Sequence, residues 1–508
     1  MAGPHTPRPS PRAVSLDDVC RTLGFDPGTT RGHDVSGVTL DSRDVRPGDL
    51  FIGLPGERVH GARFSAEVAE AGGVAVLTDV EGSSMVPEGL GCIVVDGPRG
   101  HVGDVAAEVY GRPADQLLML GVTGTNGKTT TTVLLEAGLR AAGHRPGVVG
   151  TLGAIIDGDA FATSKTTPEA TELHAMLAVM LERGVTAVAM EVSSHALAMG
   201  RVDGCVFDVA GFTQLSIDHL DFHKTEAAYF AAKLALFQPA HSRRAVITID
   251  DDGGRRVRED SRVPTTTLGE SSDADWKIEA VRPRAAGGYQ YELRGPDEAI
   301  RHCDLLLTGR FNVSNASLAQ LMLEQSGVDA AAAQRGIAEC RGVPGRMERV
   351  GPDDVTLVVD YAHTADALAR ALDAVRTPLG RVIVVFGCGG DRDTTKRGPM
   401  GEIAARLANV VVVTDDNPRT EDPARIRQAV LAGAEAVPPE QRAEIHEVGG
   451  RRAAIEQAVA RASRGDVVLV AGKGHEPGQE VDGVVTPFDD RTELIAAWDR
   501  LHPSQGPS

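Results

Sequence analysis

Continuous apolar runs recur along the chain and predict short strands buried on both faces. Such runs lie at 117–122 and 185–190, and shorter ones at 49–53 and 73–77 alternate with weak helical patterns. Strands of parallel sheets covered by helices on both faces have this unbroken apolar character, whereas half-exposed strands alternate. The pattern therefore predicts an α/β fold.

A second series of runs begins after Gly345. Apolar stretches at 355–359, 382–386, 410–413 and 467–471 predict parallel strands, with helices starting near Ala365, Met400 and Pro423. Strands that alternate with helices indicate a doubly wound α/β domain.

Breaks in these patterns divide the chain. Gly111-Arg112-Pro113 separates the first α/β region from the run at 117–122, and a length of 508 residues suggests roughly three domains. We therefore predict domains at 1–112, 113–344 and 345–508. The Pro-, Ser- and Gly-containing ends, 1–13 and 503–508, are predicted to be disordered tails.

Composition narrows the class of protein. Hydrophobic residues make up 42% and charged residues 24%, and the formal charge is −19, which disfavours nucleic acid as a partner. The six cysteines are scattered without a C-x-x-C pair, which indicates reduced thiols. We find neither a secretory signal nor a run of about 20 apolar residues, so we expect a cytoplasmic protein without a membrane partner.

A glycine-rich loop follows the run at 117–122 and carries the first chemical signal. It reads Gly124-Thr125-Asn126-Gly127-Lys128-Thr129-Thr130, and a helical pattern then continues to Ala142 and stops at Gly143. In this setting glycines let backbone N–H groups converge on phosphate oxygens, the lysine adds a mobile charge, and Thr129 offers a hydroxyl to Mg²⁺. The alternative is an ordinary Gly-Lys turn. The loop alone indicates a nucleoside triphosphate and no more.

Further polar residues follow in the middle domain. Glu191 ends the run at 185–190, and His219 and Lys233 come downstream. A carboxylate and an imidazole beside a phosphate loop suit a Mg²⁺ site. Taken singly, each of these residues has an ordinary interpretation as a solvated or hydrogen-bonded side chain.

Several ordered motifs resemble the Mur ligase superfamily. The central ones are the stretches 123–129, 191–195, 218–223 and 231–233. The resemblance covers nearly the whole chain, with further motifs at 40–43, 48–51, 309–315, 345–348, 360–364, 386–393, 416–419 and 471–476.

This resemblance implies an ATP-dependent ligase of peptidoglycan synthesis. ATP is expected to phosphorylate the D-Glu carboxylate of UDP-MurNAc-L-Ala-D-Glu, and the amine of an amino acid then attacks the acyl phosphate. The family pattern implies that Lys128, His219 and Lys233 are catalytic, that Lys233 is carbamylated, and that Thr129, Glu191, His219 and the Lys233 carbamate hold Mg²⁺.

The resemblance also implies the binding residues. The nucleotide is expected at the loop Gly124–Thr130 and at Asn312, Asn315, Arg346, Asp360 and His363. For the two asparagines, helix capping is the ordinary alternative. The N-terminal domain is expected to bind the UDP-sugar, and the UDP-MurNAc-dipeptide contacts are Ser42, Glu57, Arg58, Val59, His60, Thr166, Thr167, Ser193 and Arg201.

The amino acid is predicted from three loops that follow strands of the third domain. These loops carry Arg392, Asp416-Asn417-Pro418-Arg419, and Gly472 with Glu476. Two arginines can hold a carboxylate and Glu476 can receive an ammonium group, which suits diaminopimelate. Lysine has no distal carboxylate for Arg419 to hold, and the family's Asp-Asn-Pro-Arg form accompanies diaminopimelate. The stereoisomer, meso or LL, stays open.

The chain departs from the family pattern at a few positions. Lys165 stands where the family has Asn, Met199 where it has Gln, and Pro477-Gly478 where a residue and Tyr are common. Three alternatives remain at this point: an L-lysine-adding Mur ligase, a folylpolyglutamate-synthetase-like ligase, and a P-loop ATPase without a ligase step. We expect a monomer.

Overall fold

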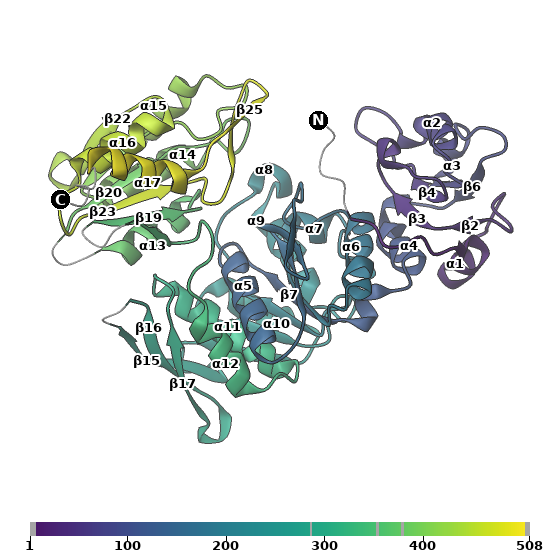
Figure 1. Cartoon of the computed structure of the whole chain (residues 1–508), viewed down its shortest axis with the longest axis horizontal. Helices are drawn as coiled ribbons and strands as arrows, with labels where there is room; N and C mark the ends of the chain where they lie inside the picture. Colours follow the sequence, from purple (N-terminus) through teal and green to yellow (C-terminus); the bar gives the residue numbers. More distant parts are fainter. Residues whose placement is uncertain (1–6, 285–286, 352–354, 377–379, 503–508) are drawn as a thin grey trace, which may run out of the picture.

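The computed structural model describes residues 7–284, 287–351, 355–376 and 380–502. Three α/β parts follow one another along the chain, and each contains its own main sheet (Figure 1). The N-terminal part (purple) and the C-terminal part (green to yellow) lie at opposite ends of the central part. The predicted α/β fold class is confirmed. The domain boundaries at 112/113 and 344/345 stay predictions.

The N-terminal part has a parallel four-stranded sheet in the order β3-β4-β5-β6. Its strands are β3 (Gly37–Thr39), β4 (Asp49–Ile52), β5 (Ala75–Thr78) and β6 (Gly91–Val94), and its helices are α1 (Leu16–Leu23), α2 (Ser65–Glu70), α3 (Val80–Ser83) and α4 (Val102–Val109). A small pair, β1 (Val14–Ser15) with β2 (Asp34–Val35), precedes it. The predicted strands at 49–53 and 73–77 are confirmed as β4 and β5.

The predicted N-terminal tail differs from the expectation over its second half. Arg8 forms an ion pair with Asp49 at 2.5 Å, and the Ser10 amide donates to Glu182 at 2.9 Å. Asp49 is buried, so its charge requires a partner, and Arg8 supplies it. Residues 7–13 are thus placed by contacts, which corrects the disordered tail for that stretch. Residues 1–6, and the predicted tail at 503–508, lie outside the described residues.

The central part has an eleven-stranded sheet in the order β10-β9-β8-β11-β7-β12-β13-β14-β15-β16-β17. Its strands are β7 (Leu118–Thr123), β8 (Pro146–Gly150), β9 (Gly153–Ile156), β10 (Asp159–Phe161), β11 (Ala187–Glu191), β12 (Val209–Phe212), β13 (Ala245–Thr248), β14 (Thr265–Gly269), β15 (Trp276–Pro283), β16 (Tyr289–Arg294) and β17 (Ile300–Leu305). The predicted strands at 117–122 and 185–190 are confirmed as β7 and β11, which pair with each other in parallel. The antiparallel extension β15-β16-β17 was not predicted: β16 and β17 alternate between more and less exposed positions, as half-exposed strands do, and contain no continuous apolar run.

Helices cover both faces of this sheet. They are α5 (Lys128–Ala141), α6 (Ala170–Glu182), α7 (Ser194–Ala198), α8 (Leu220–His223), α9 (Glu226–Leu234), α10 (Asp252–Asp260), α11 (Phe311–Gln325) and α12 (Ala330–Glu339). The helix predicted after the phosphate loop is confirmed as α5, whose C-terminal end is followed by Gly143 at φ 86°.

The C-terminal part has a six-stranded sheet in the order β18-β19-β23-β20-β21-β22. Its strands are β18 (Glu348–Val350), β19 (Thr356–Asp360), β20 (Val382–Phe386), β21 (Val410–Val413), β22 (Glu444–Glu447) and β23 (Val467–Ala471), with a separate hairpin of β24 (Gly478–Val481) and β25 (Val484–Pro487). Its helices are α13 (Ala365–Val375), α14 (Arg397–Leu407), α15 (Pro423–Glu435), α16 (Arg451–Arg461) and α17 (Asp490–Leu501). The four predicted strands are confirmed as β19, β20, β21 and β23, and the three predicted helices as α13, α14 and α15.

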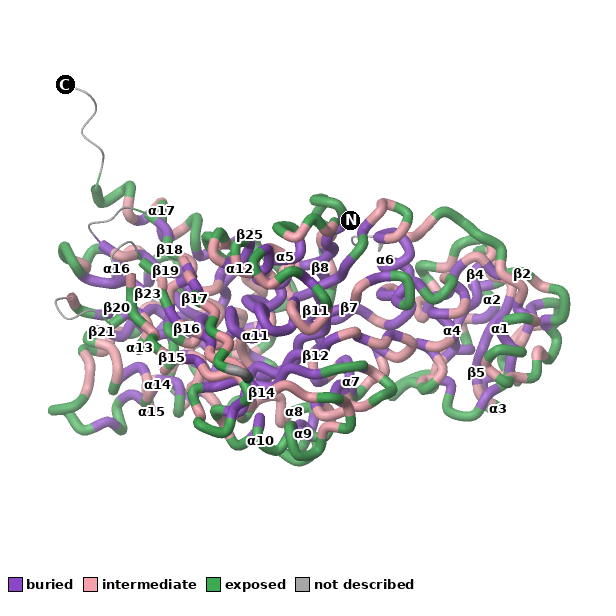
Figure 2. The backbone as a smooth tube through the Cα atoms, turned by 90° about the horizontal axis from the view of Figure 1, so that it is seen from below, coloured by how far each residue is buried: buried purple, intermediate pink, exposed green. Residues whose placement is uncertain are grey.

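Burial explains why the apolar runs were good predictors. All residues of β11, β20, β21 and β23 are buried, and the tube of Figure 2 shows the buried stretches along the middle of each part. Parallel strands covered on both faces expose neither side to water, so their positions are apolar, apart from the buried Glu191 at the end of β11. Among the described residues, no helix is long and apolar enough to cross a membrane.

Candidate active site

The phosphate loop joins β7 to α5 in a conformation that requires its glycines. Gly124 has φ 146° and Gly127 has φ 90°, both in the region that side chains disfavour. A Cβ atom at Gly124 would lie 1.9 Å from the Thr213 hydroxyl, and one at Gly127 would lie 2.4 Å from the Asn315 side-chain oxygen. The loop therefore leads directly into the N-terminus of α5, where backbone N–H groups suit an anion.

Two lysine amines converge on this loop. Lys128 Nζ donates to the carbonyls of Gly124 and Thr125 at 2.8 and 2.9 Å, and Lys233 Nζ donates to the Gly124 carbonyl at 2.8 Å. Burial lowers the pKa of Lys128, and burial together with the Lys128 charge holds the pKa of Lys233 well below its ordinary value. The loop is an electropositive cradle made of buried amines and carbonyls.

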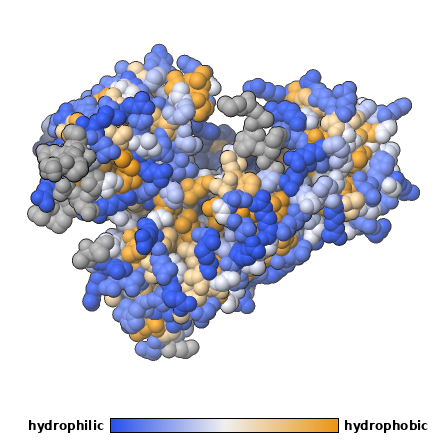
Figure 3. All heavy atoms as spheres, viewed as in Figure 1, coloured by the Kyte–Doolittle hydropathy of each residue, from blue (hydrophilic) through white to orange (hydrophobic). Residues whose placement is uncertain are grey.

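A cavity of about 170 Å³ opens beside the loop, between the central and C-terminal parts. Figure 3 shows the surface hollowed between these two parts. The lining combines most of the residues predicted to bind the nucleotide with residues predicted for metal and dipeptide: Thr125, Asn126, Gly127, Lys128, Thr129, Thr130, Thr166, Glu191, Ser193, Asn312, Asn315, Arg346, Asp360 and His363. Residues from two domains thus meet in one place, as a bimolecular ligation requires.

Glu191 and Thr129 both line this cavity and provide oxygen atoms to it. The Glu191 carboxylate is buried and accepts hydrogen bonds from the Thr151 amide at 2.8 Å and the Thr151 hydroxyl at 3.0 Å. Arg346 Nη2 donates to the Thr129 hydroxyl at 3.1 Å, and its guanidinium lies 4.1 Å from the centre of the Tyr361 ring. Thr151 and Tyr361 were not predicted as site residues. A threonine in a turn has no distinctive sequence signal, and the contact of Tyr361 with Arg346 is visible only in the structure.

His219 lies at a turn near this cavity but is not part of its lining. It has a positive φ of 55°, and its Nε2 lies 3.4 Å from Asp218. Burial, followed by the neighbouring cations, lowers its pKa to about 4, so the imidazole is neutral at neutral pH. The described residues contain no cluster of three or more His, Cys, Asp or Glu arranged to hold a metal ion.

Asn312 and Asn315 lie in the first two turns of α11 and do not cap it. Arg310 occupies the capping position without a side-chain hydrogen bond. Instead Asn312 Nδ2 donates to the Thr308 carbonyl at 2.7 Å, and Asn315 Nδ2 donates to the Asn312 side-chain oxygen at 2.9 Å. Neither asparagine therefore caps α11, contrary to the capping alternative. Both side chains line the cavity.

Asp360 is the last residue of β19 and His363 follows that strand; both line the cavity from the C-terminal part. Asp360 accepts from the amides of Met347 and Ala362 at 2.7 and 2.8 Å, and burial raises its pKa. Burial also lowers the pKa of His363, whose Nδ1 lies 2.9 Å from the Tyr361 carbonyl. The two domains also touch directly, since His475 Nε2 lies 3.1 Å from the Thr151 carbonyl.

The loops predicted to bind the amino acid meet at the ends of β20, β21 and β23. Asn417 Nδ2 donates to the Glu476 carboxylate at 3.0 Å. The buried Lys473, which was not predicted as a site residue, donates to the Asn417 side-chain oxygen at 2.8 Å and lies 3.5 Å from Glu476 and 3.8 Å from Asp416. Gly472 is required at the end of β23, because a Cβ there would lie 2.6 Å from Asp416 Oδ2.

The two predicted arginines differ in their surroundings. Arg392 is exposed. Arg419, which follows Pro418, has φ 52°, donates from Nη1 to the Gly390 carbonyl at 2.6 Å, and lies 3.4 Å from Glu480. The structure thus places the arginines on neighbouring loops but does not pair them on a common partner.

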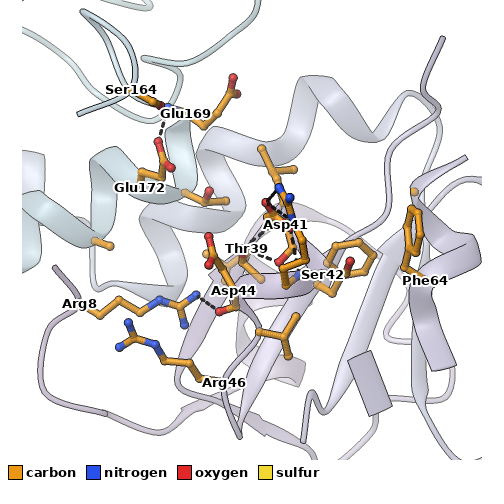
Figure 4. A pocket seen from close by; sticks show the side chains of 18 of the residues that line it. Arg8, Thr39, Asp41, Ser42, Asp44, Arg46, Phe64, Ser164, Glu169 and Glu172 are labelled. Carbon is orange, nitrogen blue, oxygen red and sulfur yellow. Dashed lines mark hydrogen bonds and ion pairs between the residues drawn. The ribbon is translucent and has the colours of Figure 1, made fainter. Parts of the chain in front are cut away.

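A larger cavity of about 1020 Å³ lies between the N-terminal and central parts (Figure 4). Ser42 and Lys165 line it, as does Arg8 from the N-terminal segment. At its edge Glu169 pairs with Arg99 at 3.1 Å, Lys165 at 3.2 Å and Arg201 at 2.9 Å. Burial by itself would raise the pKa of Glu169, but the three cations together outweigh burial, so the pKa is lowered.

The other residues predicted for the UDP-MurNAc-dipeptide lie around these cavities. Glu57, Arg58 and Val59 form an exposed loop outside the lining of the large cavity, and His60 pairs with Asp79 at 3.1 Å. The Thr167 hydroxyl donates to the Glu191 carbonyl at 2.9 Å. Thr166 and Ser193 line the cavity beside the phosphate loop, and Lys165, which precedes Thr166 in the chain, lines the larger one.

Fold and site together define a nucleotide-binding α/β protein whose reactive centre lies between domains. Comparison with family models agrees: residues 122–323 match the Mur ligase middle domain, 345–474 match "Mur ligase, glutamate ligase domain", and 34–102 match "Mur ligase family, catalytic domain". The chain belongs to the Mur ligase family.

Individual relatives are more specific. A protein of Streptomyces avermitilis, named UDP-N-acetylmuramoyl-L-alanyl-D-glutamate–2,6-diaminopimelate ligase, is 49% identical over 98% of this chain and 99% of its own. One of the same name from Corynebacterium glutamicum is 45% identical over 91% and 92%. A relative in Leifsonia xyli subsp. xyli, 45% identical over 97% and 98%, is named UDP-N-acetylmuramyl-tripeptide synthetase, without an amino acid.

Solved structures have the same fold. A 2,6-diaminopimelate ligase of the same full name aligns with a TM-score of 0.70 and 32% identity over 97% of this chain and 100% of that one. A folylpolyglutamate synthase from Mycobacterium tuberculosis aligns with a TM-score of 0.59 but 19% identity over 79% of this chain, which reflects the fold alone.

Proposed function

We propose that this chain is an ATP-dependent ligase that adds diaminopimelate to the D-Glu carboxylate of UDP-MurNAc-L-Ala-D-Glu in peptidoglycan synthesis. One observation carries the proposal: relatives named for this reaction are up to 49% identical over nearly the full length of both chains. The geometry supports it, because the phosphate loop opens into a cavity that residues of the C-terminal domain complete. The expectation of a cytoplasmic monomer stays a prediction.

The proposed reaction has two bond-forming steps. A carboxylate is a poor electrophile, so an oxygen of the D-Glu carboxylate first attacks the γ-phosphorus of ATP, which gives an acyl phosphate and releases ADP. The amine nitrogen then attacks the carbonyl carbon, the C–N bond forms, the bond from that carbon to the phosphate oxygen breaks, and inorganic phosphate leaves with loss of a proton from nitrogen. Both steps bring anions together, so positive charge and positioning dominate the catalysis.

The residues around the phosphate loop fit this task. Lys128 is held between two carbonyls at the N-terminus of α5, and Arg346 lies across the cavity at Thr129. We assign to Lys128 and Arg346 the neutralisation of phosphate charge, and to Asn312, Asn315, Asp360 and His363 the contacts to the rest of the nucleotide. Binding of the triphosphate gives the buried amines the anionic partner that they lack.

The cavity also fits Mg²⁺ in part. Thr129 and Glu191 offer a hydroxyl and a carboxylate, the hard oxygen donors that Mg²⁺ prefers, and both line the cavity. When bound, Mg²⁺ neutralises phosphate charge. His219 and a carbamylated Lys233 remain proposed ligands.

Carbamylation of Lys233 has support in the surroundings of its amine. Only a neutral amine reacts with CO₂, and burial holds the pKa of Lys233 well below its ordinary value. Carbamate formation would replace a neutral amine that faces Lys128 by an anion. We expect Lys233→Ala to lose ligase activity and to regain part of it with added short-chain carboxylates. Full activity of the variant without such rescue contradicts this role.

For the amino acid we propose that Arg419 and Arg392 hold the distal carboxylate of diaminopimelate. Asp416, Asn417 and Glu476 then receive the distal ammonium group, next to Gly472 and Pro418. The recess supports this because Asn417 and Glu476 are joined by a hydrogen bond next to the Asp416 carboxylate. L-lysine has no distal carboxylate for Arg419 to bind, which disfavours an L-lysine-adding enzyme. The large cavity beside Ser42, which we expect to hold the UDP-sugar, disfavours a folylpolyglutamate synthetase.

The deciding experiment is phosphate release from ATP with UDP-MurNAc-L-Ala-D-Glu, with and without an amino acid. We expect release to require both the nucleotide-sugar dipeptide and diaminopimelate. Release that needs neither would identify an ATPase without a ligase step. Kinetics with the meso and LL isomers and with L-lysine then fix the amino acid, and faster turnover of lysine contradicts the assignment.

A further inference from the structure

Arg419, the residue proposed to hold the substrate's distal carboxylate, already faces a carboxylate of this chain. Its Nε lies 3.4 Å from Oε2 of Glu480, and the two side chains are 23% and 38% exposed. Its Nη1 is taken by the Gly390 carbonyl. The guanidinium therefore carries an anionic partner of the same chemical type as the group that it is proposed to bind.

The hairpin β24–β25 fixes Glu480 in this place. The Arg419 amide donates to the Glu480 carbonyl at 3.1 Å, and the Asp482 amide donates to the Arg419 carbonyl at 2.7 Å. These two hydrogen bonds flank the left-handed backbone of Arg419, which is unfavourable for a residue with a side chain and requires support from its surroundings.

Side chains of the amino-acid recess reach the same hairpin. The Glu480 amide donates to the Asn417 side-chain oxygen at 3.0 Å, and Gln479 Nε2 donates to the Asp416 carbonyl at 2.6 Å. Lys473 Nζ donates to the Gly478 carbonyl at 2.7 Å. The first strand of the hairpin is thus a wall of the recess, and Glu480 is held beside Arg419 by contacts that do not involve its own carboxylate.

We propose that Glu480 is a specificity-determining residue, whose carboxylate occupies the Arg419 guanidinium until the distal carboxylate of the amino acid replaces it. This inference rests on the proposed function. A substrate with a distal carboxylate exchanges one ion pair for another. A substrate without one, such as lysine, leaves the internal pair intact and gains nothing from Arg419.

The experiment compares Glu480→Gln with wild type and with Glu402→Gln. Glu402 pairs with Arg406 at 3.0 Å on the surface of α14, so its change removes a similar ion pair of the same domain away from the recess. With ATP and UDP-MurNAc-L-Ala-D-Glu saturating, KM and kcat are measured for diaminopimelate and for L-lysine. Thermal unfolding of each variant establishes that it is folded, and Glu480→Asp serves as a second, shorter variant.

Removal of the competing carboxylate should favour diaminopimelate only. Because half-exposed ion pairs contribute modestly, we expect the KM for diaminopimelate to fall about two- to fivefold in Glu480→Gln, with kcat little changed. We expect no improvement for lysine and no change in Glu402→Gln. The difference should shrink at 1 M salt, since screening weakens the internal pair.

Two outcomes overturn the proposal. If the KM for diaminopimelate stays at the wild-type value, Glu480 does not compete for Arg419; if it rises, Glu480 supports binding instead. A wild-type chain that does not turn over diaminopimelate contradicts the proposed function itself, and that measurement is made first, so the two failures are distinguished.

Discussion

Two buried lysines lie in the two halves of the reactive centre, and their surroundings differ. Lys233, near the phosphate loop, donates to a backbone carbonyl and lies near a second cation, Lys128. Lys473, in the amino-acid recess, lies within 4 Å of the carboxylates of Asp416 and Glu476. Within the described residues the amines of the first region form no ion pair, although Glu191 and Asp218 lie near enough to influence them, whereas the amine of the second region lies within ion-pair distance of two carboxylates.

This difference matches what each region is proposed to bind. A triphosphate brings several negative charges, so an electropositive cradle gains from binding and is strained without it. A zwitterionic amino acid brings both signs at once. In a recess whose charges are already paired, a substrate charge can bind only by replacing an internal partner. Specificity then depends on whether the substrate offers a charged group for each internal partner that it replaces.

The largest effect that we expect concerns the ion pair beneath the amino-acid recess. Arg451 and Asp490 are both fully buried and paired at 2.6 Å, and Arg451 also donates to the Ala471 carbonyl at 2.9 Å. Arg451→Met leaves a buried carboxylate without a partner and should lower the free energy of unfolding by about 3–5 kcal/mol. Urea denaturation measures this change.

The matched control for this prediction removes both charges. Arg451→Met combined with Asp490→Leu should recover most of the lost stability, because an apolar pair can replace a buried ion pair at small cost. If the double variant is as unstable as the single one, the packing of the Arg451 side chain matters more for stability than its charge. The ion pair between Arg451 and Asp490 would then not be what stabilises the C-terminal part.

The next largest effect tests the phosphate region. Lys128→Met removes the mobile cation of the loop and should lower kcat by about 10²- to 10³-fold, the range seen when one group that stabilises developing negative charge is lost. The stability should be kept or raised, because a desolvated amine disappears. Phosphate release and thermal unfolding together check this pair of changes, and an active variant would contradict the role of Lys128.

The sequence predicted the elements of both regions well, for a physical reason. Strands such as β20 and β23 are buried on both faces, so they can be predicted from their apolar runs without knowing which elements pack against them. The conformation of the phosphate loop could also be predicted, because it belongs to one continuous segment and the glycines that permit its positive φ angles are visible in the sequence.

The contacts that complete the sites were harder to predict. Lys473 lies within the motif at 471–476, but its contacts with Asp416 and Asn417 come from a loop more than 50 residues away. Glu480 likewise meets Arg419 from a distant segment, and nothing in its own neighbourhood distinguishes it from a solvated charge. The N-terminal contact of Arg8 was missed for the same reason, because its partner Asp49 is set by tertiary packing, which local periodicity does not encode.

A smaller effect sharpens the contrast between the two lysines. In the uncarbamylated protein, Lys233→Met should raise the free energy of unfolding by about 1–3 kcal/mol at neutral pH, because an apolar side chain replaces a desolvated amine. Burial lowers the pKa of Lys233 in the fold, so between that value and the ordinary value the unfolded chain binds one proton more than the folded chain. The stability of wild type should therefore rise with pH toward about 10, relative to the variant.

Urea denaturation of both proteins between pH 7 and pH 10 measures this difference. A difference that is constant over the whole range would mean that Lys233 titrates alike in both states. A suitable control is Lys277→Met, since Lys277 lies in the extension of the central sheet at an only partly buried position, and its change should leave the pH dependence unaltered.

The smallest effect concerns Arg419 and tests whether the amino-acid recess works by exchange of partners. Arg419→Lys keeps the charge but loses the planar group that can hold the Gly390 carbonyl and a carboxylate at once. We expect the KM for diaminopimelate to rise about tenfold, with the KM for ATP unchanged, because the phosphate region lies in another domain. The two KM values from one phosphate-release assay separate these effects. If the KM for diaminopimelate and the KM for ATP rose equally, Arg419 would act in the packing of the domains and not in recognition of the amino acid. The difference in charge between the two regions would then not explain which ligand each region binds.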